Sequence, residues 1–469
     1  MFKLRIYNTL TKKKEIIKPA KDKKINLFVC GATVYDFAHM GHARTYVFFD
    51  CFAKYLKKIG FDVFYLQNIT DLDDKIIMRS KEKGVEPKSL ALAFEKEYLK
   101  DMKNLGVNAV SKYARATSYI KEITSQVKRL MEKGIAYKID NDGIYYDISK
   151  FENYGKLSGR TVLGAEDAIS RVDYSKDKRN RGDFCLWKFR QEEIEPCWPS
   201  PLGKGRPGWH IEDTAITEKF FGAQYDIHGG GRDLIFPHHE AEIAQMEALS
   251  GKKPMAKYWM HTGFLTVNGQ KMSKSLGNFI TIDDFLKRNS CQQLRFLVIR
   301  NLWRSPFDYS ESSMIEVRTS LEKIEEFLRK LKARSGKQKG KNNQLKLVKK
   351  LKADFYSQLD DDFNTPKAFA VLFNFIKKEN SYLDKNLISE KDAKEIYNFF
   401  EEINDIFGII DFKKVNRAIP AKIKQLVLAR EKYRKNQEWQ KADQMRQKIE
   451  KQGFTIEDTK DGPVAKAIT

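Results

Sequence analysis

The order of two short apolar segments around a helical stretch constrains the fold of this chain most strongly. The apolar segments are residues 25–29 and 62–66, and the helical stretch between them covers about residues 41–58. This order predicts a strand–helix–strand unit with parallel strands, and such sheets bind ligands at the carboxyl ends of their strands. Cys30 and Thr70 each lie just beyond a predicted strand, so we expect both at a binding site.

Two motifs far apart in the sequence carry groups that suit phosphate. His39-Met-Gly-His42 stands where the predicted helix begins, and Lys271-Met-Ser-Lys274-Ser stands on a polar loop. Free N–H groups and the helix dipole attract anions at a helix N-terminus, and lysine ammonium groups neutralise phosphates. The two motifs therefore predict a site for a nucleoside triphosphate that does not use a P-loop. Taken alone, the lysine motif could also be an ordinary surface loop.

The charge of the chain indicates an acidic partner. Its 86 basic residues outnumber its 63 acidic ones, which gives a formal charge of +23 and a pI near 9.5. Nucleic acid is the commonest partner of such a chain, although a lysine-rich surface that serves only solubility explains the charge equally well. At 469 residues the chain should form about three domains.

The cysteines and the apolar segments favour a cytoplasmic protein. The five cysteines form no Cys-x-x-Cys pair, and their odd number argues against a disulfide framework. The first residues include no apolar signal region, and no apolar run approaches the roughly 18 residues that span a bilayer. We therefore expect no membrane partner.

Three further motifs narrow the interpretation. They are Asn68-Ile-Thr-Asp-Leu-Asp-Asp-Lys75, Gly205-Arg-Pro-Gly-Trp-His-Ile-Glu-Asp213 and Asp226-Ile-His-Gly-Gly-Gly-Arg-Asp-Leu-Ile-Phe-Pro-His-His-Glu-Ala-Glu242. Together with the histidine and lysine motifs, they resemble in order and spacing the class I aminoacyl-tRNA synthetases, and among these the cysteinyl-tRNA synthetases. The resemblance covers nearly the whole chain, with Met40 in place of the isoleucine of the family's first signature.

The resemblance and the helical and turn patterns together predict an α/β fold. A catalytic domain with a Rossmann-like parallel sheet and a connective insertion should precede an α-helical bundle and a small C-terminal anticodon-binding domain. The expected segments are the first catalytic half at 1–105, the insertion at 106–205, the second catalytic half at 206–265, the lysine-motif and stem-contact region at 266–310, the bundle at 311–412 and the C-terminal domain at 413–469.

The resemblance assigns the ATP site to the first two motifs. In adenylation the substrate carboxylate attacks the α-phosphorus of ATP, so the enzyme supplies positioning and charge stabilisation rather than a nucleophile. The expected catalytic residues are His39, His42, Lys271 and Lys274. The expected ATP-binding residues are these four together with Gly41 and Ser273, and Mg²⁺ should accompany the ATP.

A zinc site is expected, with one departure from the family pattern. His238 and Glu242 lie four residues apart, which puts both on one helical face, although such a pair is more often a surface contact. The resemblance adds Cys30 and position 213, where the family has a second cysteine and this chain has Asp213. Aspartate can bind zinc and keeps the formal charge, so we expect about one weakly held zinc ion per chain on Cys30, Asp213, His238 and Glu242. The alternative is a site without metal, in which Asp213 only accepts hydrogen bonds.

The amino-acid pocket follows from the same resemblance. Its expected residues are Cys30, Thr33, Thr70, Trp209, His228 and Asp233. Trp209 would form a wall for a small substrate, although a tryptophan is also a common core residue, and Asp233 would neutralise the α-ammonium group. In the family, zinc binds the substrate thiolate and so excludes serine, whose hydroxyl is a harder ligand.

The C-terminal region mixes cations, an aromatic residue and acids in a helical pattern. The resemblance implies that it reads an anticodon, because stacking on unpaired bases with charged contacts at their edges is how RNA loops are recognised. The candidate residues are Arg430, Trp439, Asp443 and Asp458. An amphipathic helix pair with a solvated basic face is nearly as good an explanation for any one of them.

These observations predict a monomeric ligase that activates L-cysteine with ATP and transfers it to the terminal ribose of tRNA(Cys). One alternative is a cysteine ligase acting on a small amino-sugar acceptor, which the basic helical C-terminus argues against. Another is a non-catalytic tRNA-binding paralogue, which His39, His42 and Lys274 argue against. A zinc hydrolase is disfavoured because the chain has no His-Glu-x-x-His sequence.

Overall fold

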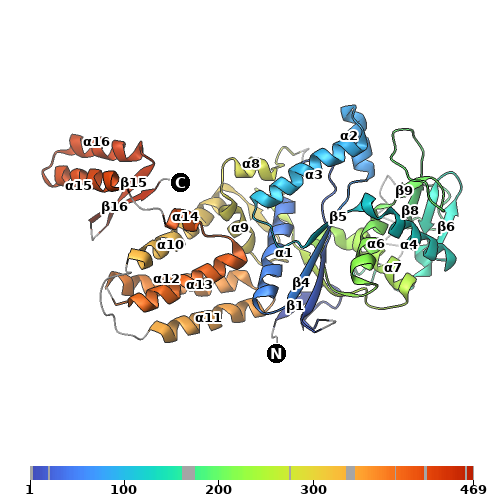
Figure 1. Cartoon of the computed structure of the whole chain (residues 1–469), viewed down its shortest axis with the longest axis horizontal. Helices are drawn as coiled ribbons and strands as arrows, with labels where there is room; N and C mark the ends of the chain where they lie inside the picture. Colours follow the sequence, from blue (N-terminus) through green and yellow to red (C-terminus); the bar gives the residue numbers. More distant parts are fainter. Residues whose placement is uncertain are drawn as a thin grey trace.

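The parts of the chain follow one another along an elongated molecule. The computed structural model describes residues 4–19, 22–160, 175–273, 276–333, 344–385, 387–416, 420–459 and 462–467. The insertion lies at one end, the central sheet comes next, and the helical bundle and the C-terminal helices lie at the other end (Figure 1).

A five-stranded parallel sheet forms the centre of the molecule. Its strands, in spatial order, are β11 (Ala256–Thr262), β10 (Tyr225–Gly231), β3 (Lys24–Val29), β4 (Asp62–Ile69) and β5 (Lys112–Arg115). Helix α1 (Met40–Lys58) connects β3 to β4, which confirms the strand–helix–strand unit expected from the sequence. The carboxyl ends of β3, β4 and β10 meet at one edge, where Cys30, Thr70 and Arg232 follow the strands.

A smaller antiparallel sheet forms most of the insertion. Its strands are β6 (Ala136–Ile139), β7 (Gly143–Tyr146), β8 (Phe184–Phe189) and β9 (Gly205–Pro207), and helix α4 (Ile120–Glu132) precedes them. No strands were predicted for this insertion from the sequence. Strand β5 also lies within the segment expected as insertion, yet it pairs with β4 of the central sheet.

Several helices and a three-stranded sheet surround the central sheet. The helices are α2 (Asp74–Lys83), α3 (Pro87–Asn104), α6 (Trp209–Phe221), α7 (Glu240–Ser250), α8 (Ile282–Leu286) and α9 (Cys291–Ile299). The small sheet contains β12 (Leu265–Val267), β13 (Gln270–Lys271) and β14 (Phe307–Tyr309), and the hairpin β1 (Arg5–Asn8) with β2 (Lys13–Ile16) flanks the central sheet. Asn268 and Gly269, both with positive φ, form the turn between β12 and β13.

The helical bundle shares its hydrophobic core with the central sheet. Its helices are α10 (Glu311–Ala333), α11 (Gln344–Asp360), α12 (Thr365–Asp384), α13 (Glu390–Phe407) and α14 (Phe412–Val415). Phe48 of α1 stacks on Trp303 and meets Phe363 edge-on, with centroid distances of 5.2 and 5.9 Å. The fully buried Arg295 donates hydrogen bonds to Asp50 of α1 and to the carbonyl of Phe407 in α13. The bundle and the central sheet therefore form one packed body.

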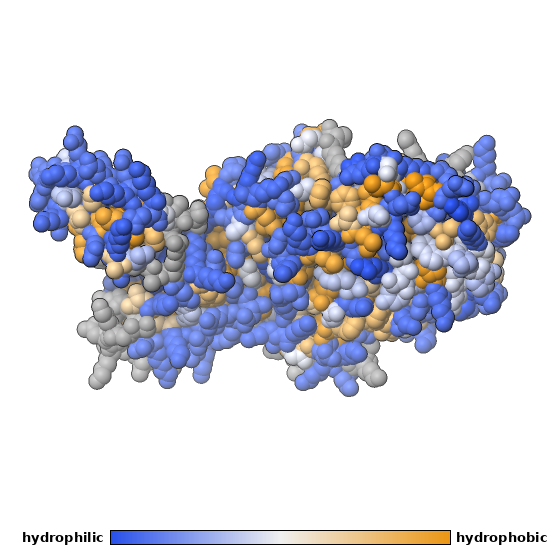
Figure 2. Space-filling model, turned by 45° about the horizontal axis from the view of Figure 1, so that its top comes forward, coloured by the Kyte–Doolittle hydropathy of each residue, from blue (hydrophilic) through white to orange (hydrophobic). Residues whose placement is uncertain are grey.

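The C-terminal unit has a core of its own. Helices α15 (Ala421–Lys435) and α16 (Trp439–Glu450) pack on the hairpin of β15 (Phe454–Thr459) and β16 (Gly462–Ala467). Its core residues are Ile423, Val427, Ile449, Phe454, Ile456 and Ala465. Figure 2 shows this unit standing apart from the main body, with a largely hydrophilic surface. Among the described helices, none has both the length and the apolar character that a membrane span requires.

Candidate active site and metal centre

The histidine motif forms the start of helix α1. His39 is the N-cap residue, and its Nδ1 accepts a hydrogen bond from the backbone N–H of Gly41 at 3.1 Å. His42 Nδ1 accepts one from the backbone N–H of His39 at 3.3 Å, and the two rings stack with centroids 3.9 Å apart. Because each Nδ1 is an acceptor, each neutral ring carries its proton on Nε2. Burial lowers the pKa of His42 well below its usual value, and His39 and Lys75 lower it further, so this ring is a neutral donor at pH 7.

The lysine motif begins on strand β13 and lies beside the histidine motif. Lys271 is exposed, and Asn278 closes the loop by accepting from the N–H of Ser273 at 2.8 Å and donating to the carbonyl of Lys271 at 3.2 Å. The ring of Phe279 meets the ring of His39 edge-on, with centroids 5.2 Å apart. Lys274 and the serine after it lie outside the described residues. The segment that follows the lysine motif thus packs against the histidine motif.

A buried cluster of possible metal ligands lies at the carboxyl ends of β3 and β10. The four residues expected to bind zinc come together: Cys30, Asp213, His238 and Glu242 offer ligand atoms within 4.8 Å of one another. Asp213 Oδ2 lies 3.3 Å from Cys30 Sγ and 3.1 Å from His238 Nε2, and His238 Nε2 lies 3.1 Å from Glu242 Oε1.

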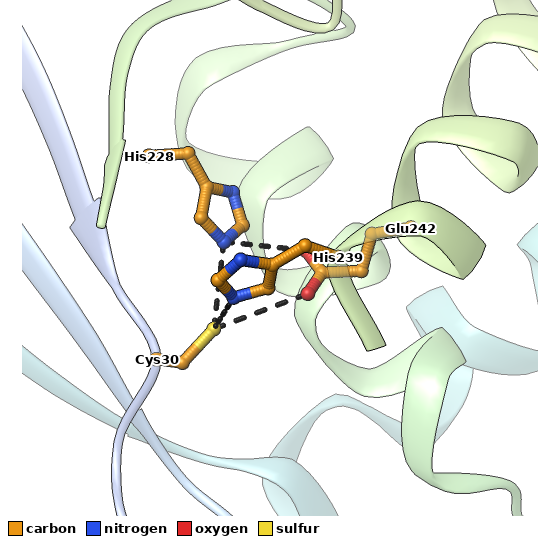
Figure 3. A group of neighbouring side chains, drawn as sticks. All are labelled: Cys30, His228, His239 and Glu242. Carbon is orange, nitrogen blue, oxygen red and sulfur yellow. Dashed lines mark hydrogen bonds and ion pairs between the residues drawn. The ribbon is translucent and has the colours of Figure 1, made fainter. Parts of the chain in front are cut away.

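A second set of ligands overlaps the first. Cys30 and Glu242 also meet His228 of β10 and His239, which directly precedes α7 (Figure 3). His239 Nε2 lies 3.1 Å and His228 Nε2 3.4 Å from Cys30 Sγ, and His228 Nε2 lies 3.6 Å from Glu242 Oε2. His228 was expected in the amino-acid pocket, and His239 was not singled out. The cluster therefore offers six side chains to a metal ion.

The cluster has the chemistry of a cation site. Cys30, Asp213 and Glu242 can each carry a negative charge, and in the described part of the chain none of them forms an ion pair with a lysine or arginine. Asp213 Oδ1 and Glu242 Oε2 are buried acceptors without a hydrogen bond from any described residue. Burial raises the pKa of the Cys30 thiol well above its usual value, and the two carboxylates raise it further. Buried acids of this kind need a compensating positive charge, and thiolate, imidazole and carboxylate are the ligands of zinc.

Further histidines orient the imidazoles of the cluster. His210 Nδ1 lies 2.8 Å from His238 Nδ1, and His261 Nε2 lies 2.8 Å from His239 Nδ1. Burial lowers the pKa of His210 and of His239 well below the usual value, and it lowers the pKa of His261 to about 3. These rings are neutral at pH 7, the state in which imidazole binds a metal, and an outer hydrogen bond of this kind fixes which nitrogen faces the ion.

The expected amino-acid pocket adjoins the cluster on the side of β4 and α6. Thr33 and Thr70 face each other across an isolated parallel bridge, and Thr70 Oγ1 donates to Glu212 Oε2 at 3.1 Å. Trp209 is 37% exposed and stacks on His238, with ring centroids 4.2 Å apart. Asp233 is exposed and lies outside the buried cluster. A cleft of about 420 Å³ contains Thr33 and Trp209 in its lining.

Charged residues of the insertion line the same cleft. Arg206 of β9 is nearly buried and forms an ion pair with Asp74 at the start of α2. Glu195 and Lys188 also line the cleft. Residues of the insertion and of α2 therefore line the same cleft as Trp209.

The C-terminal candidates differ in their surroundings. Arg430 is nearly buried and donates to Asp458 through both Nη atoms, at 2.7 and 3.0 Å. Trp439 is 58% exposed at the start of α16, and Asp443 is exposed in the same helix. Arg430 and Asp458 thus hold α15 against β15, whereas Trp439 and Asp443 face solvent.

Two residues beside the candidate site were not predicted from the sequence. His239 follows His238 directly, and neighbouring residues of a regular helix point in different directions. Glu212 is fully buried between Thr70 and Asp213, and its Oε1 has no hydrogen-bond partner among the described residues. Each of the two residues is next in the sequence to a predicted metal ligand, and this adjacency is the sequence feature that could have indicated them.

Comparison with known families identifies two regions of the chain. Residues 16–319 match the family model described as "tRNA synthetases class I (C) catalytic domain". Residues 354–411 match the model of the DALR domain. The first match covers more than half of the chain and includes every residue of the histidine, lysine and metal-cluster motifs.

Two relatives are similar over nearly their whole length. The chain is 45% identical over 457 residues to the cysteine–tRNA ligase of Thermoplasma volcanium, covering 97% of this chain and 98% of that one. It is 44% identical over 479 residues to the cysteine–tRNA ligase of Methanococcus maripaludis, covering 99% of each chain.

Solved structures support the fold. A methionyl-tRNA synthetase of Mycobacterium tuberculosis in complex with methionyl-adenylate superposes with a TM-score of 0.59 at 16% identity, covering 82% of this chain and 90% of that one. A leucyl-tRNA synthetase ternary complex from Agrobacterium radiobacter gives a TM-score of 0.63 at 10% identity, covering 84% and 85%. At such identities the similarity concerns architecture alone.

Proposed function

The chain belongs to the class I cysteine–tRNA ligases, and from that premise we propose how its own residues divide the work. The reaction joins L-cysteine to tRNA(Cys) at the expense of ATP. The observation that carries the proposal is the placement of three features around the carboxyl ends of β3, β4 and β10. They are the stacked pair His39 and His42, the lysine hairpin (strands β12 and β13, which lead into the lysine motif) and the buried acid–histidine cluster.

We assign the activation step to the two signature motifs. His39 and His42 present Nε2–H donors at the start of α1, where the helix dipole also favours the phosphates of ATP. Lys271 and Lys274 neutralise the charge that develops as pyrophosphate leaves, and Ser273 and Gly41 complete the ATP contacts. No protein nucleophile is needed, because the carboxylate of cysteine attacks the α-phosphorus directly.

We assign the selection of cysteine to the buried cluster and the pocket beside it. Cys30, Asp213, His238 and Glu242 would hold one zinc ion, which supplies a soft Lewis acid that prefers the sulfur of cysteine to the hydroxyl of serine. This set is preferred to the set with His228 and His239 because it engages all three acids, Cys30, Asp213 and Glu242, whereas the other set leaves Asp213 out. With one aspartate in place of a thiolate, the ion should be held more weakly than by two cysteines.

The remaining pocket residues position the substrate. Thr70 donates its hydroxyl proton to Glu212 and accepts from the side-chain amide of Asn68 at 3.3 Å, so its orientation is fixed before the substrate binds. Trp209 closes the exposed side of the pocket by stacking on His238. Thr33, His228 and Asp233 are assigned to the same pocket, with Asp233 facing the α-ammonium group.

We assign tRNA binding outside the pocket to the C-terminal unit and propose that the protein acts as a monomer in the cytoplasm. Trp439 and Asp443 are exposed there and would contact anticodon bases directly. Arg430 and Asp458 are bound to each other and would support that surface. A small amino-sugar acceptor is disfavoured, because the cysteine–tRNA ligases of similar length match this chain through its C-terminal unit.

Pyrophosphate exchange and tRNA charging test the role assignments together. Lys271→Ala should lower the rate of cysteine-dependent exchange by about 10²–10³-fold and leave the KM for cysteine nearly unchanged, since its contact forms as charge develops. Lys274→Ala should have an effect at least as large. Lys287→Ala is the matched control, because Lys287 directly follows α8, is exposed and, among the described residues, forms ion pairs with Asp283 and Asp284. If Lys271→Ala lowered the affinity for cysteine but left kcat unchanged, the assignment of Lys271 to the departing pyrophosphate would be wrong.

A further inference from the structure

We infer that Arg44 is a positioning residue that fixes the lysine hairpin against the helix carrying the two histidines. Its guanidinium group joins α1 to the base of the sheet β12–β13–β14, from which the lysine motif extends. This inference rests on the proposed function, because it concerns the placement of the phosphate-binding lysines. It adds a residue to which the sequence motifs gave no role.

The contacts of Arg44 are made to backbone carbonyls. The side chain is 2% exposed, and its Nη1 donates to the carbonyl of Phe264. Its Nη2 donates to the carbonyls of Trp303, at 3.1 Å, and Ser305. The guanidinium plane lies over the ring of Phe307, 4.5 Å from its centroid. Five donors in a rigid planar fork allow arginine to hold several carbonyls at once, which lysine cannot do.

These carbonyls stand at the base of the hairpin that carries the lysine motif. Phe264 directly precedes β12, and Phe307 begins β14, which pairs in parallel with β12. Strand β12 pairs in turn with β13, where Thr266 is opposite Lys271. The Arg44 side chain and the pairing of β12 with β13 therefore connect α1 to Lys271. A shift of the guanidinium group should move β12 and, with it, the lysine.

The far end of the lysine loop is attached to the same helix by backbone contacts. His39 and Thr281 form an antiparallel bridge, the N–H of Met40 donates to the carbonyl of Ile280 at 3.1 Å, and the N–H of Ile282 donates to the carbonyl of Ala38 at 3.0 Å. The described part of the loop is thus held at both ends relative to the histidines. Arg44 provides the side-chain part of this attachment, and substitution can remove it.

The surroundings of Arg44 argue for positioning rather than for folding alone. The carbonyl of Trp303 also accepts from the N–H of Gly263 at 2.9 Å, and the carbonyl of Phe264 accepts from the N–H of Phe307 at 3.1 Å. These carbonyls keep a backbone partner when the guanidinium group is removed. Within the described ranges Arg44 forms no ion pair with a carboxylate, so its loss leaves no buried acid without its counter-charge.

Kinetics that separate activation from transfer test the inference. In Arg44→Gln, kcat/KM for ATP in pyrophosphate exchange should fall about 10–100-fold. A displacement of about 1 Å at a group that positions the reactants can lower the rate by about 100-fold. The KM for cysteine and the rate of transfer from preformed cysteinyl-adenylate to tRNA should stay within about twofold, since neither step uses the lysines. Arg44→Lys should show an intermediate loss, and it carries the test if Arg44→Gln does not fold.

Arg304→Gln is the matched control. Arg304 lies in the same loop as Trp303 and Ser305 but donates to Asp362 of the bundle, with Nε 2.8 Å from Oδ2. Its substitution should leave the ATP kinetics unchanged. Arg44 variants with normal ATP kinetics, or with equal losses in ATP use, cysteine binding and transfer, would overturn the inference. If the wild-type protein itself showed no cysteine-dependent exchange, the proposed function would fail instead, so the two failures are distinguishable.

Discussion

Substitutions outside the metal ligands can show which of the two overlapping ligand sets holds the zinc ion. In the described part of the chain, the ring nitrogen of His210 lies within hydrogen-bond distance of His238, and that of His261 within hydrogen-bond distance of His239. We predict that His210→Phe weakens zinc binding and that His261→Phe has little effect. For His238 Nε2 to face the ion, its Nδ1 must carry the proton and donate to His210. A phenylalanine ring fills a similar volume but cannot accept that proton.

The size of the effect follows from the loss of one outer hydrogen bond. Such losses typically reduce metal affinity by about 10–100-fold, or about 1.4–2.7 kcal/mol. Substituting a direct ligand should cost more, so His238→Ala should lose most of the metal. Competition with a chromophoric chelator of known affinity measures the zinc dissociation constant for all three variants, and thermal melting of each apoprotein controls for damage to the fold.

The outcome that would refute this reasoning is the reverse ranking. If His261→Phe lost zinc affinity and His210→Phe kept it, the ion would be held by Cys30, His228, His239 and Glu242. Asp213 would then be a hydrogen-bond acceptor beside the metal. Wild-type zinc affinity in all three variants would show that His238 is not a ligand and that neither His210 nor His261 orients one.

Three further predictions concern the metal site, the bundle and the C-terminal unit. Asp213→Cys should slow zinc loss to a chelator without abolishing activity, because a softer ligand replaces a carboxylate in the same place. Burial raises the pKa of Glu379 to about 7, and both of its oxygens lack a hydrogen-bond partner in the described residues. The folded protein therefore binds this proton more tightly than the unfolded chain, and wild-type stability should fall as pH rises from about 4.5 to 7. Glu379→Gln should raise the melting temperature by about 2–4 °C at pH 8 and by less at pH 5, and an equal gain at both would contradict the assignment. A chain ending at Asn416 should keep pyrophosphate exchange and lose efficient tRNA charging, because the C-terminal unit has a separate core; undiminished charging would remove the anticodon role.

The sequence predicted the parts of the fold that are specified locally. The parallel strands β3 and β4 and the helix between them follow from apolar runs and helical periodicity that are contiguous in the chain. The insertion sheet was not predicted, because its strands are three to six residues long and β7 pairs with β8 across a long intervening segment. Such pairing depends on contacts that no short window of sequence contains.

Site residues that belong to a recognisable motif could be predicted from the sequence. Site residues whose side-chain direction depends on an irregular backbone could not. Cys30 and Glu242 were placed by their motifs. His239 approaches Cys30 because residues Ile235–His239 form a π-type turn in which Phe236 is extended, with φ −139° and ψ 131°. This departure from regular helix lets His238 and His239 both reach the cluster, and no periodicity in the sequence reports it.

The most direct test of the account measures metal content and amino-acid selectivity on the same preparation. Protein purified without chelators and supplied with zinc should contain about one zinc ion per chain, and pyrophosphate exchange should depend on cysteine and reject serine. Removing the ion with a chelator should reduce the preference for cysteine, and restoring zinc should recover it. A preparation that carries no metal and still rejects serine would contradict the account, and would leave Trp209 and Asp213 to select the substrate by shape and hydrogen bonding.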